Sequence, residues 1–150
     1  MLDFLYRKSL WNLNLMQITI DKIEKIILLG GGRLLIELAR WCKSEGEQVF
    51  IVTSPRHAEE IIESGKSFED ILSLENIPYI VVKDIATNEV KNFLGNLCNA
   101  FCLSLGAAWI FKEETINTLF NKKLFNLHGS KLPQNRGGGF FSWQILMGNR

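Results

Sequence analysis

Asn126 and His128 are the residues whose types and spacing point most directly to chemistry. They lie in the stretch 125–133, which reads FNLHGSKLP and overlaps a predicted strand over 123–127. Side chains two positions apart on a strand lie on the same side of it. An amide and an imidazole placed side by side can donate hydrogen bonds to a carbonyl oxygen that gains negative charge during a reaction. The pair therefore suits chemistry that passes through an oxyanion.

A structural interpretation of the same residues stands beside the chemical one. A single histidine at a strand end is more often packed or hydrogen-bonded without taking part in catalysis. The other histidine, His57, follows Ser54 and Pro55, which are typical of a helix start, with serine as cap and proline in the first turn. We expect the His57 side chain to be solvated, or at most to contact the residues that meet the substrate without touching the substrate itself.

The elements that would position Asn126 and His128 alternate along the chain as strand and helix. Short apolar runs predict buried strands, and apolar stripes at helical spacing predict helices between them. The predicted strands cover 25–29, 49–52, 79–82, 100–105 and 123–127. The predicted helices cover 33–44, 68–74, 88–97, 112–120 and 141–147, and a further helix opens at Ser54-Pro55. This order indicates an α/β fold, a Rossmann-like open and mostly parallel sheet with helices on both faces. Such sheets bind ligands beyond the carboxyl ends of their strands.

Three consecutive glycines, 30–32, follow the first predicted strand. Dinucleotide-binding proteins place a phosphate loop there, but their pattern needs a small residue at position 35, which is Leu35. The acid expected at the end of the second strand is also missing, so an NAD site is disfavoured. Two interpretations stay open: a tight turn that lets the next helix pack closely, or a backbone that approaches a ligand.

Composition narrows the class of protein. The chain has 150 residues, 47% of them hydrophobic and 22% charged, with a formal net charge of +1. These values predict one globular domain and give no electrostatic argument for a nucleic-acid partner or a membrane. The N-terminal stretch lacks the features of a signal peptide, so we expect a cytoplasmic protein.

The cysteines carry a further expectation. Cys42, Cys98 and Cys102 are odd in number, which fits a reducing compartment. The spacing of Cys98 and Cys102 would suit a metal pair, but no histidine or second cysteine pair accompanies them. We therefore expect buried structural thiols and no metal site.

The residues 126–133, NLHGSKLP, resemble the N-x-H-x-S-x-L-P signature of the formyltetrahydrofolate-dependent formyltransferases. The resemblance extends over most of the chain from about Lys25. Two further stretches, 104–111 (SLGAAWIF) and 133–143 (PQNRGGGFFSW), look most like the sugar N-formyltransferases, which act on nucleotide-linked amino sugars. The resemblance identifies 23–150 as part of a formyltransferase catalytic domain and leaves 1–22 as an N-terminal extension.

The resemblance implies a donor, an acceptor and roles for particular residues. The donor would be N10-formyltetrahydrofolate, and the acceptor would be the amino group of a nucleotide-linked sugar. Asn126 would hold the oxyanion through its amide, and His128 would stabilise it as a second donor. The folate pocket would be lined by Trp109, Ile110 and Phe111, and walled by a loop that contains Leu132, Pro133 and Gly137. For Trp109 and Phe111, packing in the core is an equal alternative.

The chain also departs from the family pattern. The family's third catalytic residue is an Asp well downstream of the histidine, and no acidic residue lies between His128 and Arg150. We therefore expect a truncated formyltransferase with weak or absent activity. Other acceptors, methionyl-tRNA or glycinamide ribonucleotide, remain alternatives, as does a non-catalytic folate-binding or interaction remnant. A homodimer is left open.

Overall fold

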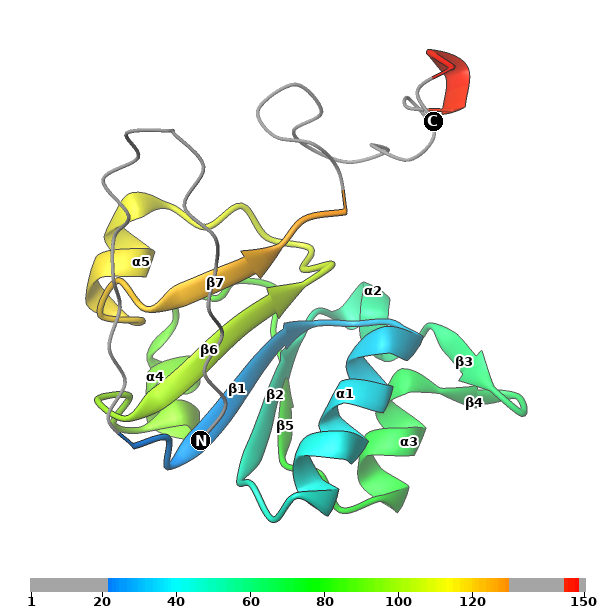
Figure 1. Ribbon diagram of the computed structural model, residues 1–150, viewed down its shortest axis with the longest axis horizontal. Coiled ribbons are helices and arrows are strands. Elements are labelled where there is room, and N and C mark those ends of the chain that lie inside the picture. The colour runs from blue at the N-terminus through cyan, green and yellow to red at the C-terminus, as the bar shows by residue number, and fades with distance from the viewer. Residues whose placement is uncertain (1–21, 130–144, 149–150) are drawn as a thin grey trace, which may run out of the picture.

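A five-stranded parallel sheet forms the centre of the molecule. The structure, a computed structural model, describes residues 22–129 and 145–148. The strands lie in the order β5-β2-β1-β6-β7, and every neighbouring pair runs parallel (Figure 1). They are β1 (Lys25–Gly30), β2 (Val49–Thr53), β5 (Tyr79–Val81), β6 (Ala100–Leu105) and β7 (Leu124–Leu127).

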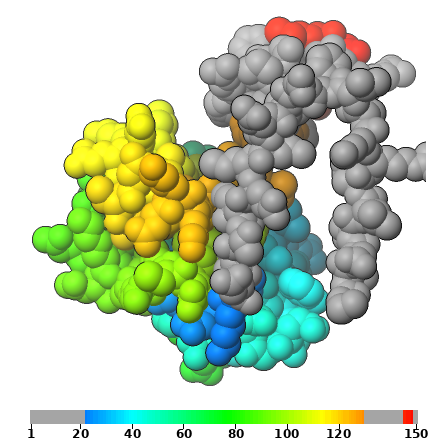
Figure 2. Space-filling view, turned by 60° about the vertical axis from the view of Figure 1, so that its left-hand side comes forward, coloured from blue at the N-terminus to red at the C-terminus, as the bar shows by residue number. Residues whose placement is uncertain are grey.

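Helices cover both faces of this sheet. On one face, α1 (Arg33–Ser44) and α3 (Phe68–Leu74) bury their apolar stripes against one core cluster. On the other face, α4 (Asn88–Leu94) and the residues that follow α5 (Glu113–Thr118) pack into a second cluster. Figure 2 shows α4, α5 and the start of β7 as one continuous surface, in green, yellow and orange. The predicted α/β fold, Rossmann-like with a mostly parallel sheet, is thereby confirmed.

Local chemistry explains where the helices begin. α3 opens with a capping box: the Asp70 amide donates to the Ser67 hydroxyl at 3.1 Å, and the Ser67 amide donates to the Asp70 carboxylate at 2.9 Å. α2 (Pro55–Ala58) begins as predicted, with Ser54 as its cap and Pro55 in its first turn. α4 ends at Leu94, short of the predicted 97, because Gly95 turns the backbone to a φ of 61°.

A small antiparallel hairpin is the one element within the described residues that the sequence prediction lacked. β3 (Ile61–Glu63) pairs with β4 (Lys66–Ser67) through a turn at Ser64 and Gly65, which have φ values of 50° and 75°. Positive φ at both turn residues is the conformation that two-residue hairpins favour. The hairpin lies beside α3 and extends the molecule away from the sheet (Figure 1).

Several other boundaries moved by one or two residues. β2 runs to Thr53, β5 ends at Val81, and α5 is shorter than the predicted 112–120 because Lys112 and Leu119 are its caps. Most of the predicted helix 141–147, and nearly all of the extension 1–22, lie outside the described residues. Among the helices within 22–129 and 145–148, none has the length and apolar character needed to cross a bilayer.

Candidate functional site

The carboxyl ends of the parallel strands meet at one edge of the sheet. Gly30 ends β1 with a φ of 134°, and a Cβ on it would lie 2.0 Å from the carbonyl oxygen of Leu105, which ends β6. No side chain fits between the two backbones. Gly30 therefore lets the ends of β1 and β6 come into direct contact. Close packing of the following helix, and approach of the backbone to a ligand, both stay predictions for this turn.

Asn126 lies on β7 at this edge. Its register partner on β6 is Ser104, and Leu124, two residues earlier on β7, packs against the core cluster on the α4 face. Because side chains alternate along a strand, Asn126 points to the same face as Leu124 but beyond the covered core. Asn126 is exposed, as a residue that meets a ligand must be.

His128 comes directly after β7, which ends at Leu127. It is partly buried. The structure therefore places the Asn126–His128 pair where the sequence analysis expected it, at the carboxyl edge of the last described strand. Their roles in a reaction stay predictions.

The segment after β6 contains three residues predicted to line a folate pocket. Two of them, Trp109 and Phe111, pack within the protein. The Trp109 indole Nε1 donates to the Lys83 carbonyl at 3.1 Å, and its ring meets Phe111 edge-on at 6.5 Å between centroids. Phe111 in turn meets the buried Phe120 at 6.1 Å, and both Trp109 and Phe111 pack against the α4-side core. Ile110 points the other way and is 93% exposed.

Packing thus explains Trp109 and Phe111 without a ligand, while Ile110 offers an apolar surface with no such explanation. The assignment of all three to a folate pocket remains a prediction. The other predicted pocket residues, Leu132, Pro133 and Gly137, lie outside the described residues.

His57 corrects one expectation. We predicted a side chain that is solvated or at most supports the reacting groups indirectly. The ring is in fact partly buried against the backbone of Gly31, and its Nδ1 is buried without a hydrogen-bond partner among the described residues, so the solvated alternative is wrong. Burial lowers the pKa of His57 below its ordinary value. The sequence carried no signal of this contact, because Gly31 and α2 meet only through tertiary packing.

A hollow of about 660 Å³ lies beside this contact. It is lined by Gly31, Gly32, Arg56, His57, Glu59 and Glu60, which come from the turn after β1 and from α2. The lining combines Arg56 and His57 with the two carboxylates of Glu59 and Glu60. These charges largely balance, so the hollow favours neither an anionic nor a cationic ligand.

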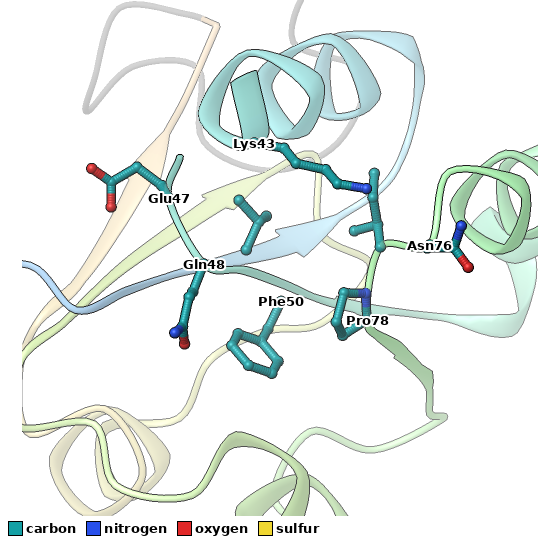
Figure 3. A pocket seen from close by; sticks show the side chains of 8 residues that line it. Lys43, Glu47, Gln48, Phe50, Asn76 and Pro78 are labelled. Carbon is teal, nitrogen blue, oxygen red and sulfur yellow. The ribbon is translucent and has the colours of Figure 1, made fainter. Parts of the chain in front are cut away.

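A second, smaller hollow lies far from Asn126. It has a volume of about 290 Å³ at the amino ends of β2 and β5, with Phe50 and Pro78 in its wall (Figure 3). Lys43 extends from the end of α1 toward the segment that carries Asn76, where its ammonium donates to the Glu75 carbonyl (Figure 3). Ligands of open parallel sheets bind at the opposite edge, so this hollow does not belong to the candidate site.

The thiols also differ from expectation in one case. Cys42 and Cys102 are buried, as predicted, but Cys98 is exposed in the segment between α4 and β6. The expectation failed because Gly95 ends α4 early and turns the following residues out to solvent.

Comparison with known proteins identifies the fold. No protein-family profile matches the chain, and no curated protein sequence matches it. Among solved structures, it is similar to the crystal structure of a phosphoribosylglycinamide formyltransferase from Anaplasma phagocytophilum, with a TM-score of 0.55 and 17% sequence identity. The match covers 83% of this chain and 59% of that one, so the chain spans little more than half of its structural neighbour. The chain therefore shares the α/β fold of that neighbour, with a mostly parallel sheet covered by helices.

Proposed function

We propose that the chain is a formyltransferase domain that uses N10-formyltetrahydrofolate as its donor and acts in the cytoplasm. The observation that carries the proposal is Asn126, exposed on β7 at the carboxyl edge of a parallel sheet with this fold. The motif 126–133 adds support that the fold alone lacks, because it sets a histidine and a Leu-Pro step at defined distances from that asparagine.

The proposed reaction is addition followed by elimination. The nitrogen of a primary amine attacks the formyl carbon, and the electron pair of the C=O bond moves onto oxygen. Asn126 Nδ2 and an imidazole N–H of His128 donate hydrogen bonds to that oxyanion. As the carbonyl forms again, the bond from carbon to N10 breaks, N10 gains a proton, and the attacking nitrogen loses one.

The reaction also requires a group that takes the proton from the attacking amine. The stretch 129–150 contains no Asp or Glu that could carry the proton from the amine. A positioned acid or base typically contributes about 10²- to 10⁴-fold to a rate. Within residues 1–150 the proposal therefore assigns roles in oxyanion stabilisation and none in proton transfer.

For the acceptor we propose the amino group of a nucleotide-linked sugar, on the basis of the stretches 104–111 and 133–143. Glycinamide ribonucleotide is the second candidate, favoured by the name of the structural neighbour. Methionyl-tRNA is less suited to a chain with a formal net charge of +1, because phosphate backbones bind basic surfaces.

Calorimetric titration and a transfer assay test the proposal together. The first measures binding of 5-formyltetrahydrofolate, a non-transferring isomer of the donor, and the second measures formylated product by mass with each of the three acceptors. Asn126→Ala should lower the transfer rate about 10²-fold while the donor KM changes little, since the lost hydrogen bond forms mainly in the transition state.

Asn92→Ala provides the matched control, because Asn92 is an exposed asparagine on α4, away from the strand ends. It should leave binding and transfer unchanged. Binding without transfer for any acceptor indicates a folate-binding remnant. Absence of both binding and transfer contradicts the proposal.

A further inference from the structure

Ser104 carries a deeply buried hydroxyl group. Its residue is only 1% exposed, and its Oγ is fully buried with no partner among the described residues. Buried hydroxyls in folded proteins are nearly always hydrogen-bonded, because they give up their bonds to water on folding. An unpaired one therefore requires an explanation.

Of the two residues in register with Ser104 on the neighbouring strands, only Asn126 has a polar side chain. β1 places Leu29 in register with Ser104, and β7 places Asn126 in register on the other side. Cys102, two residues earlier on β6, and Leu124 on β7 belong to the same apolar face. Adjacent strands lie about 4.8 Å apart, so the two side chains are neighbours, although the structure shows no hydrogen bond between them. Rotation of the exposed Asn126 side chain can bring its amide to the Ser104 hydroxyl.

We propose that Ser104 positions Asn126 by donating its hydroxyl hydrogen to the amide oxygen Oδ1. This inference rests on the proposed function, in which Asn126 must present its NH₂ group to the oxyanion. A primary amide has an acceptor end and a donor end, and nothing about its shape decides which end faces the ligand. A donor beneath it at Ser104 engages the oxygen, and this turns the two N–H bonds outward to the formyl oxygen.

The alternative is that Ser104 only fills space in the core. Serine and alanine differ by one small atom, so the two roles make opposite predictions for Ser104→Ala. The lost bond runs from a buried hydroxyl to an exposed amide that water can satisfy, and a buried polar group is removed with it, so Ser104→Ala should change the melting temperature little. Removing a group that positions Asn126 should still impair the site.

Thr53→Val is the matched control. Thr53 is also fully buried near the end of a strand, but its hydroxyl donates to the Gly30 carbonyl at 2.7 Å, and it lies on β2, with β1 and β6 between it and β7. Its loss should lower the melting temperature and should leave Asn126 undisturbed.

The first measurement needs no catalytic activity. The side-chain NH₂ signals of Asn126 in ¹H–¹⁵N spectra are identified by their disappearance in Asn126→Ala. We expect these signals to shift in Ser104→Ala, to shift less in Ser104→Cys, which keeps a weak donor of similar size, and to stay in place in Thr53→Val.

The second measurement is the transfer rate. Ser104→Ala should lower kcat about fivefold to tenfold, the typical effect of one neutral hydrogen bond, with the donor KM unchanged. In the Asn126→Ala background the same change should have no further effect, because the group it positions is gone.

Unchanged Asn126 signals in Ser104→Ala overturn the proposal, and so does a parallel fall in melting temperature and kcat, which would assign Ser104 a packing role. If the wild-type chain neither binds 5-formyltetrahydrofolate nor transfers a formyl group, the proposed function fails. The spectra then still decide whether Ser104 holds Asn126.

Discussion

Gly31 and His57 fit against each other so closely that Gly31 has no room for a side chain. A Cβ on Gly31 would lie 2.5 Å from the Cβ of His57 and 2.6 Å from its Cγ. The imidazole of α2 therefore rests on the bare backbone of the turn after β1. This contact joins the second strand–helix unit to the first at the edge of the sheet where the candidate site lies.

Gly31→Ala should destabilise the protein by about 1–3 kcal/mol, the usual cost of forcing an extra methyl group into a packed site. The free energy of unfolding in urea measures the loss. In a His57→Gly background the same substitution should cost clearly less, because the atoms it strikes are gone. An equal cost in both backgrounds would show that backbone conformation, and not the imidazole, demands glycine at this position.

The buried imidazole also predicts a dependence of stability on pH. Desolvation lowers the pKa of His57, so the unfolded state binds a proton more readily than the folded state does. The free energy of unfolding should therefore be highest above the ordinary value of 6.5 and fall as the pH drops below it.

Urea titrations at about pH 7.5 and 5.5, two values that bracket the histidine titration, measure this fall. His57→Gln should flatten it, since the group that takes up the proton is absent. Carboxylates such as Glu63 and Asp70 take up protons only at a lower pH, because hydrogen bonds lower their pKa values. They therefore contribute little to the fall in stability between these two pH values. A slope that is identical in wild type and His57→Gln would contradict the assignment.

Arg40 links three parts of the chain. It donates from Nε to Glu75 at 2.9 Å, and from Nη2 to Glu63 on β3 at 2.6 Å. Arg40→Ala should loosen the hairpin more than the sheet, so the Phe68 amide, which donates to the Glu60 carbonyl, should exchange with deuterium severalfold faster.

High salt should weaken the effect of Arg40→Ala, because about a third of each charged side chain is exposed. Arg56→Ala, at an exposed arginine on α2, serves as the control and should leave the exchange of Phe68 unchanged. Equal acceleration across the strands of the main sheet would instead indicate global destabilisation.

The three thiols should differ sharply in reactivity. Cys98 is exposed, whereas Cys42 is 3% exposed and Cys102 is 1% exposed. Burial raises the pKa of Cys102 to about 12, so its reactive thiolate is scarce at neutral pH. A disulfide reagent should modify one thiol rapidly in the native protein and all three after denaturation. Cys98→Ser should remove the rapid phase, and a second rapid thiol in that variant would contradict the burial of the other two.

Much of the fold was accessible from the sequence because its strands are short apolar runs with clear ends. Ala100–Leu105 and Phe68–Leu74 were predicted to the residue. The hairpin β3–β4 was missed because its strands are too short for a periodic pattern. Ser64-Gly65, a pair suited to positive φ, was the signal that could have revealed it.

Only part of the candidate site could likewise be predicted from the sequence. The position of Asn126 followed from local sequence, since a strand and its end are visible there. The contact of His57 with Gly31, and the register of Ser104 with Asn126, depend on how distant segments pack. Periodicity and propensity describe neighbours along the chain, so they cannot supply such pairings.

The position of β1 between β2 and β6 determines the order in which the strands can pair during synthesis. One side of β1 is completed by β2, which follows it closely, but its other side waits for β6, whose first residue, Ala100, pairs with Lys25. A chain emerging from the ribosome can join β1, β2 and β5 early, while the second edge of its innermost strand stays bare until Leu105 has appeared. Assembly of the nascent chain is thus governed by its late-made strands, and a stall before them would leave an open edge able to pair with another chain.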